Sequence, residues 1–205
     1  MPSVYDLKPA FQNLLRPLVT RLARIGITAN QVTIAALLLS IAVGLCIAVS
    51  ETAVWSLWLI PLTLFLRMAL NAIDGMLARE HNMKTPLGAV LNELGDVLSD
   101  AALYLPFAVH PLLQPAVVVL FVVGAVISEM TGVVAVQIGA ARRYDGPMGK
   151  SDRALAMSVL AVAMACGLPS IPARGMLLLF TLLLLPTIWR RAARALAEIS
   201  TCPST

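Results

Sequence analysis

Five carboxylates stand inside or at the ends of apolar stretches of this 205-residue chain: Asp74, Glu93, Asp96, Asp100 and Glu129. If those stretches cross a membrane, a carboxylate near the middle costs at least about 2.5–3.5 kcal/mol, a cost that is tolerated where the acid has a function and a partner. Four of the five lie between positions 74 and 100. This segment is therefore the strongest candidate for a functional site.

Helical spacing gathers oxygen-bearing side chains of this segment on one face. At about 100° per residue, Asn92, Asp96 and Asp100 follow one another in steps of four. Asn71 and Asp74 are three positions apart and so are neighbours on a preceding helix. Two antiparallel helices joined by a short loop would bring both sets together. Carboxylate and amide oxygens suit hard divalent cations, so the pattern predicts a cation site; the alternative is a polar network satisfied between the helices.

Small and basic residues mark the same region. Gly75 and Ala78 follow Asp74, and Gly88 opens the next helix. Such residues allow close helix packing in membranes, or here they leave room for a flat ligand. Arg79 stands where the chain leaves the membrane, so its guanidinium either holds a phosphate group bidentately or only anchors the topology.

Composition defines the class of protein that must position these residues. The chain is 59% hydrophobic and 13% charged, with a mean hydropathy of +0.86. Soluble domains carry roughly 25% charge, so this chain lacks the polar side chains to cover a globular surface. That excludes a soluble enzyme, a disordered tail, a fibrous repeat and a disulfide-stapled domain. We predict an all-α, polytopic membrane protein.

Six apolar runs, 32–49, 53–70, 87–109, 116–138, 154–168 and 175–189, approach the length of a membrane-spanning helix. Residues 4–24 have an amphipathic pattern and predict a helix on the membrane surface, with a soluble packing helix as the alternative. Lysines and arginines collect before the first run, after every second run and in the tail. Because positive loops stay cytoplasmic, both termini are predicted to be cytoplasmic.

The predicted organisation has three parts: an amphipathic juxtamembrane helix at 1–29, a six-helix transmembrane domain at 30–195 and a short cytoplasmic tail at 196–205. We expect a multi-pass protein of the cell inner membrane, in contact with the lipid bilayer and with no nucleic-acid partner. The scattered cysteines are expected to be packing residues or free thiols.

The segment NAIDGMLAR at 71–79, followed by Gly88, Asn92 and Asp96, resembles the signature of the CDP-alcohol phosphatidyltransferase family. The family pattern is DxxDGxxAR, eight residues, G, three residues, D, three residues, D. The spacing is kept in full, and the departures are Asn71 and Asn92, where the family has aspartate. Such a long gapped pattern is specific, and the entry to the first run at 26–33 also looks like the family.

The resemblance implies phosphoryl transfer at the cytoplasmic face. An acceptor alcohol attacks the lipid-side phosphorus of a CDP-linked lipid such as CDP-diacylglycerol, and CMP leaves, in the synthesis of a phospholipid. It also implies a divalent cation, Mg²⁺ or Mn²⁺, that offsets the developing charge, and a homodimer. The acceptor is a small alcohol that the motif does not identify.

Residue roles carry over position by position. The resemblance implies metal ligation by Asn71, Asp74, Asn92 and Asp96, with Asp96 as general base. Positions that hold the CDP-lipid match Gly75, Arg79 and Thr85, and the small residues of the nucleotide site match Ala78 and Gly88. Basic residues of the family that hold phosphate match Lys150 and Arg153, for which the alternative is a positive cytoplasmic loop.

The two asparagines lower the charge of the predicted cation site, since each replaces a carboxylate by an amide. Asp100, as a further ligand, and Glu93 could restore negative charge, and the hypothesis is an enzyme that uses one metal ion or binds a second weakly. Two other functions compete: an ion or proton transporter, because intramembrane carboxylates also mark transporters, and a catalytically weak relative that binds CDP-lipid. Glu129 has no assigned role.

Overall fold

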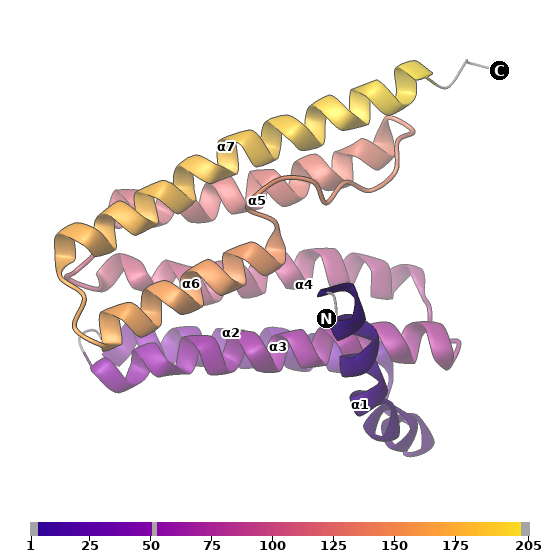
Figure 1. The fold of residues 1–205 in the computed structure, drawn as a ribbon. Helices are drawn as coiled ribbons and strands as arrows, with labels where there is room; N and C mark the ends of the chain where they lie inside the picture. The colour runs from indigo at the N-terminus through magenta and orange to yellow at the C-terminus, as the bar shows by residue number, and fades with distance from the viewer. Residues whose placement is uncertain (1–3, 51–52, 202–205) are drawn as a thin grey trace. The chain divides into compact units, whose positions relative to one another are not determined.

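A computed structural model describes residues 4–50 and 53–201, and within these ranges the chain is helical with no strand (Figure 1). The elements in chain order are α1 (Val4–Arg24), α2 (Ala29–Ser50), α3 (Val54–Glu80), α4 (Pro86–Tyr104), the short 3₁₀ helix η1 (Leu105–Val109), α5 (Pro115–Gln137), α6 (Lys150–Ala165) and α7 (Ser170–Thr201). The predicted all-α class is confirmed.

Four of the described helices, α2, α3, α5 and α7, are long and apolar enough to cross a membrane. The sequence predicts six spans. The two remaining candidates, α4 and α6, differ from these four helices in their charge and length. Helix α4 carries three acidic side chains in 19 residues, and α6 has only 16 residues, with three charged side chains in its first turn. Side chains such as Ile34, Leu38 and Leu45 of α2 are exposed, as lipid-facing residues would be.

Two helices extend beyond the runs predicted from hydropathy. Helix α3 continues ten residues past position 70 and so carries the whole segment 71–79 on an unbroken helix. Helix α7 continues past Trp189 to Thr201, so most of the predicted tail at 196–205 is helical, and positions 202–205 lie outside the described residues.

The helices form two compact units, each of which is built from separate stretches of chain. The first comprises Met1–Ala42 and Leu62–Ser99. Its core joins α1 to the adjoining ends of α2 and α3 through Val19, Val32, Ile73 and Leu77. Leu14, on the other face of α1, is 76% exposed. Helix α1 is therefore a packing helix on one face and offers an apolar side chain on another.

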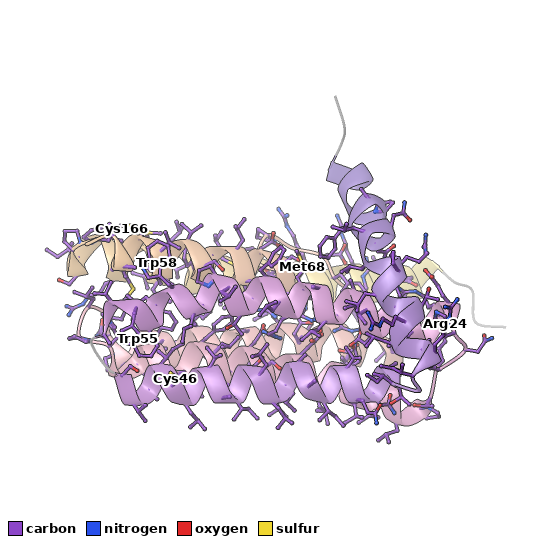
Figure 2. All side chains as sticks on the ribbon, turned by 90° about the horizontal axis from the view of Figure 1, so that it is seen from below. Arg24, Cys46, Trp55, Trp58, Met68 and Cys166 are labelled. Carbon is purple, nitrogen blue, oxygen red and sulfur yellow. The ribbon has the colours of Figure 1, made fainter. Side chains whose placement is uncertain are left out.

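The second unit comprises Val43–Pro61 and Asp100–Thr205, and in it α5 packs along α7 (Figure 1). The rings of Tyr104 and Phe121 lie 5.8 Å apart between centroids. Trp55 and Trp58, in the first turns of α3, are exposed (Figure 2). Exposed tryptophans at a helix end are typical of the membrane interface.

Candidate functional site

The turn between α3 and α4 fixes the start of the helix that carries Asp96. Asn82 has a left-handed backbone, with φ of 55°, which reverses the chain after α3. The Thr85 hydroxyl oxygen then accepts a hydrogen bond from the Gly88 amide at 2.9 Å, and Pro86 begins the helix. A threonine cap followed by proline at the first helical position is a strong helix start. Thr85, a predicted substrate contact, is thus also the cap of α4.

Asn71 and Asp96 are brought together across α3 and α4. The Asn71 amide nitrogen donates to the Asp96 carboxylate at 3.3 Å. This contact joins the first position of the signature on α3 to its last position on α4. The antiparallel arrangement expected from the short loop is therefore present within the first unit.

Asp74 is buried one turn further along α3. Its carboxylate accepts a hydrogen bond from the Thr33 hydroxyl of α2 at 2.9 Å. Asn92 stands one turn before Asp96 on α4 and is exposed. Three helices of the first unit therefore position the predicted ligands. Thr33 had been singled out only as part of the entry to the first run, and not as a partner of Asp74.

Two glycines of the signature make room for neighbouring polar groups. A Cβ atom on Gly75 would lie 3.0 Å from the guanidinium of Arg79, so this arginine folds back along α3 over the glycine. A Cβ atom on Gly88 would lie 2.6 Å from the side-chain oxygen of Asn30. Both positions were predicted as substrate contacts. Ala78, the third small residue, is half-buried against the core of the first unit.

Arg67 is a residue of this site that the sequence interpretation missed. It is 3% exposed, and its Nη2 lies 3.5 Å from the backbone oxygen of Asp96 and 3.9 Å from the carboxylate. The sequence contains a signal that could have identified Arg67, because a basic residue inside the apolar run 53–70 is costly to bury in a membrane. It stands one helical turn before Asn71, on the same face.

Asp100 and Arg153 have a different arrangement from the one expected. The Arg153 guanidinium contacts Asp100 at 3.0 and 3.3 Å and Glu129 at 3.0 Å, and Arg153 is only 1% exposed. A buried guanidinium needs carboxylate partners because the lone charge is very costly to bury. The predicted extra metal ligand and the predicted phosphate ligand are thus paired with each other in the second unit.

Glu129, unassigned by the sequence, is the centre of this pairing. It also accepts from Arg142 at 2.9 Å and lies 3.3 Å from Arg191. Gly132 allows the approach, since a Cβ atom there would lie 2.1 Å from the Arg142 guanidinium. Three arginines from separate parts of the second unit therefore converge on one carboxylate.

The loop between α5 and α6 carries a second, more exposed set of charges. Asp145 bonds to Arg143 at 2.8 Å and to Arg194. Burial raises the pKa of Asp145, but the hydrogen bonds from the two arginines outweigh it, so the pKa lies below its ordinary value. Lys150, a predicted phosphate ligand, is half-buried at the first turn of α6.

The donor set limits which metal ion fits. Among the described residues, no three Asp, Glu, His or Cys side chains gather where they could hold a metal ion. Only Asp74 and Asp96 of the four signature positions are carboxylates, and Asn71 and Asn92 add amide oxygens. Mg²⁺ is commonly bound through one or two carboxylates together with substrate phosphates. Two carboxylates on adjoining helices fit such an ion.

Known proteins are similar to this chain over most of its length. The sequence profile described as CDP-alcohol phosphatidyltransferase matches residues 26–197. The inner membrane protein YnbA of Escherichia coli (strain K12) is 48% identical over 163 residues, which are 80% of this chain and 81% of that protein.

Solved structures share the fold. Phosphatidylinositol phosphate synthase PgsA1 of Mycobacterium tuberculosis with CDP-DAG bound superimposes with a TM-score of 0.74 at 24% identity, covering 92% of this chain and 94% of that one. The same enzyme in complex with manganese and citrate gives a TM-score of 0.73 at 23% identity, covering 92% and 90% of the two chains.

Proposed function

The chain belongs to the CDP-alcohol phosphatidyltransferase family, and from that membership we propose how its residues transfer a phosphatidyl group. The donor is CDP-diacylglycerol, the acceptor is a small alcohol, and the products are a phospholipid and CMP. The observation that carries the proposal is the contact of Asn71 with Asp96 across α3 and α4, inside the matched region. It joins the two ends of the signature in space.

A divalent cation is held by the carboxylates of Asp74 and Asp96, with the amide oxygens of Asn71 and Asn92 as further ligands. When bound, the ion supplies charge stabilisation to the pyrophosphate oxygens of the donor. Mg²⁺ and Mn²⁺ both suit oxygen ligands, and a PgsA1 structure contains manganese. Asp100 is left out of the ligand set because it is paired with Arg153.

Asp96 acts as the general base. It takes the proton of the acceptor hydroxyl as the new bond from oxygen to the lipid-side phosphorus forms. The bond from that phosphorus to the bridging oxygen breaks, and its electron pair leaves with CMP. Arg79, folded over Gly75, is placed to hold a phosphate group through two N–H donors. Gly75 and Thr85 contact the CDP-lipid, and Ala78 and Gly88 line the nucleotide.

The membrane arrangement is part of the proposal. Helices α4 and α6 cross the bilayer together with the four apolar helices, with their acids and bases turned to other protein groups. Helix α1 lies at the cytoplasmic interface, with exposed Leu14 toward lipid. Both termini are cytoplasmic, the chain crosses the inner membrane several times, and two chains form a homodimer. The relative YnbA is described as an inner membrane protein.

Lys150, which is half-buried at the start of α6 in the second unit, would hold a phosphate group. Arg153 acts indirectly, because its ion pairs with Asp100 and Glu129 hold the first turn of α6, which carries Lys150.

A second function, binding of CDP-lipid with weak catalysis, is favoured by one specific observation: two of the four ligand positions are amides.

The test is metal-dependent release of CMP from cytidine-labelled CDP-diacylglycerol by the purified protein, with candidate alcohols as acceptors. Wild type releases CMP with Mg²⁺ or Mn²⁺ and stops with EDTA. Asp96→Asn lowers the rate by about 10²–10⁴-fold, as expected for loss of a general base. Glu198→Gln, which removes a partly exposed carboxylate of the second unit, keeps the wild-type rate.

The outcomes separate the two functions. Binding of CDP-diacylglycerol without release of CMP would identify the weak lipid-binding relative. Release that is the same in Asp96→Asn as in wild type would remove Asp96 as the base. The substitutions Asn71→Asp and Asn92→Asp are expected to strengthen the metal-dependent release of CMP, since each adds a negative charge to the ligand set.

A further inference from the structure

The first turns of α2 and α4 are joined by a pair of polar side chains. Asn30 is the second residue of α2, and its Nδ2 donates to the Thr85 hydroxyl oxygen at 3.4 Å. Thr85 caps α4, and the same oxygen accepts from the Gly88 amide at 2.9 Å. The contact of Asn30 with Thr85 spans 55 positions of sequence and ties the starts of two helices of the first unit together.

Gly88 determines which way the Asn30 amide points. A Cβ atom on Gly88 would lie 2.6 Å from Asn30 Oδ1 and 3.0 Å from Thr85 Oγ1. The Asn30 oxygen therefore rests against the Cα of a glycine, whose hydrogens an oxygen accepts weakly. Turned over, the amide would direct its N–H groups at those hydrogens. The nitrogen of Asn30 thus faces Thr85, and any side chain at position 88 would displace it.

Two accepted hydrogen bonds determine what the Thr85 hydroxyl can do. A hydroxyl has two acceptor lone pairs and one donor hydrogen. The nitrogens of Gly88 and Asn30 occupy both lone pairs, so the O–H bond takes the remaining direction, away from both nitrogens. Among residues 4–50 and 53–201, no hydrogen bond has this hydroxyl as its donor. Thr85 is exposed, so its hydrogen is available to an oxygen of a ligand.

We propose that Asn30 is a positioning residue that keeps the Thr85 hydroxyl a hydrogen-bond donor toward an oxygen of the CDP-lipid. The proposal rests on the function above, in which Thr85 contacts this lipid. Without the Asn30 amide, the hydroxyl is free to rotate its hydrogen into the vacated direction and to present a lone pair to the ligand. Phosphate and carbonyl oxygens accept but do not donate, so that orientation is repulsive. Asn30 thus acts through Thr85, with no contact of its own to the lipid.

The test is a double-mutant cycle on the binding of CDP-diacylglycerol by the purified full-length chain, measured as Kd without an acceptor alcohol. Asn30→Ala is expected to raise the Kd about threefold to tenfold, and Thr85→Val about tenfold, which corresponds to one hydrogen bond. With both changes, the Kd stays within about twofold of that of Thr85→Val, because no hydroxyl is left to orient. Thr85→Ser keeps the hydroxyl and so keeps both the affinity and its dependence on Asn30.

Asn30→Asp tests the direction of the hydrogen bond and leaves the Thr85 cap in place. A carboxylate only accepts, so the Thr85 hydrogen turns toward it and away from the lipid. Gln31→Glu is the matched control, because it adds the same charge one position away and its oxygen can still accept from the Thr28 amide, as Gln31 Oε1 does at 2.9 Å. Asn30→Asp is expected to raise the Kd about tenfold more than Gln31→Glu does.

Three outcomes would overturn the inference. Additive effects of Asn30→Ala and Thr85→Val would mean that Asn30 does not act through Thr85. Equal Kd values for Asn30→Asp and Gln31→Glu would mean that the direction of the hydrogen bond has no effect. A wild type that does not bind CDP-diacylglycerol would leave the hydroxyl without its ligand. If Thr85→Val does not fold, the comparison of Asn30→Asp with Gln31→Glu decides.

Failure of the proposed function shows separately, because the cycle measures binding and the transferase is measured by release of CMP. Release of CMP by wild type together with additive effects in the cycle contradicts only the role of Asn30. A coupled cycle in a protein that binds CDP-diacylglycerol and never releases CMP contradicts only the transferase.

Discussion

Four carboxylates of the described helices, Asp74, Asp96, Asp100 and Glu129, fall into two environments, and we infer their roles from their neighbours. In the first unit Asp74 accepts from Thr33 and Asp96 accepts from Asn71, and the Asp96 carboxylate also lies 3.9 Å from Arg67. Asp100 and Glu129 in the second unit are bound by buried arginine. A carboxylate enclosed by guanidinium groups has its charge already satisfied. We therefore propose the first pair, rather than the second, as ligands of a metal ion.

Thr33 is predicted to tune the metal site through Asp74. Thr33→Val removes the hydroxyl that bonds Asp74 at 2.9 Å with little change in volume. Loss of such an outer partner typically costs about 10–100-fold in metal affinity or activity. The Mn²⁺ concentration for half-maximal CMP release should rise by that factor.

Thr181→Val is the matched control for this change, because the Thr181 hydroxyl bonds only the backbone of its own helix. It should leave the Mn²⁺ requirement unchanged. Equal Mn²⁺ requirements in Thr33→Val and wild type would contradict a ligand role for Asp74.

Glu129 is predicted to be a stability residue. Glu129→Gln leaves Arg142, Arg153 and Arg191 without their shared carboxylate. Removing one partner of a buried ion pair costs about 3–5 kcal/mol. The midpoint of thermal unfolding of the variant in detergent should therefore lie well below that of the wild type. Glu198→Gln breaks a pair at a partly exposed site and should cost no more than about 1 kcal/mol. Similar melting of the two variants would argue against a structural role for the buried network.

At the scale of elements, hydropathy predicts the apolar helices well and the polar helix ends poorly. The run 32–49 corresponds to α2 and the run 116–138 to α5 within a few residues. The run 53–70 stops ten residues before the end of α3, because the signature is polar while its backbone remains helical. Helix α4 ends at Tyr104 and gives way to η1, where Pro106 lacks the amide hydrogen that an α-helix needs.

The crossing of α2 and α4 in the second unit depends on a glycine. A Cβ atom on Gly44 would lie 2.0 Å from the backbone oxygen of Ala102, and backbone cannot move aside as a side chain can. Gly44→Ala is expected to cost about 1–3 kcal/mol of stability, as overpacking does. The measurement is the midpoint of thermal unfolding in detergent.

Gly175→Ala serves as the control, since nothing lies within 4 Å of its added carbon. It should be neutral, or stabilising by up to about 1 kcal/mol because alanine favours the helix. A Gly44→Ala protein as stable as Gly175→Ala would show that the two helices cross less closely than described.

At the scale of the whole molecule, the signature predicted the family and the neighbourhood of Asn71 and Asp96, while the long-range pairs escaped prediction. Asp100 and Arg153 are 53 positions apart, and nothing in their local spacing distinguishes an ion pair from two separate ligands. Thr33 and Asp74, 41 positions apart, pose the same difficulty. Such contacts depend on which helix faces pack together, and periodicity does not specify that.

The number of crossings is testable through α6, whose 16 residues extend about 24 Å, against about 30 Å of hydrocarbon. Cys166 is exposed just after this helix, and Tyr144 is exposed in the loop before it. In a background with Cys46 and Cys202 replaced, a membrane-impermeant maleimide should label Cys166 in right-side-out vesicles. The Y144C variant lacking Cys166 should be labelled only in inverted vesicles. Labelling of both sites from one side would mean that α6 does not cross.

The central claim is that a divalent cation is held between α3 and α4 by Asp74 and Asp96. Anomalous diffraction from crystals of the full chain grown with Mn²⁺ and CDP-diacylglycerol tests it most directly. The account predicts a manganese peak about 2.0–2.6 Å from carboxylate oxygens of both residues. A crystal with Mn²⁺ at a concentration that supports CMP release, and with no manganese peak beside these two carboxylates, would contradict it.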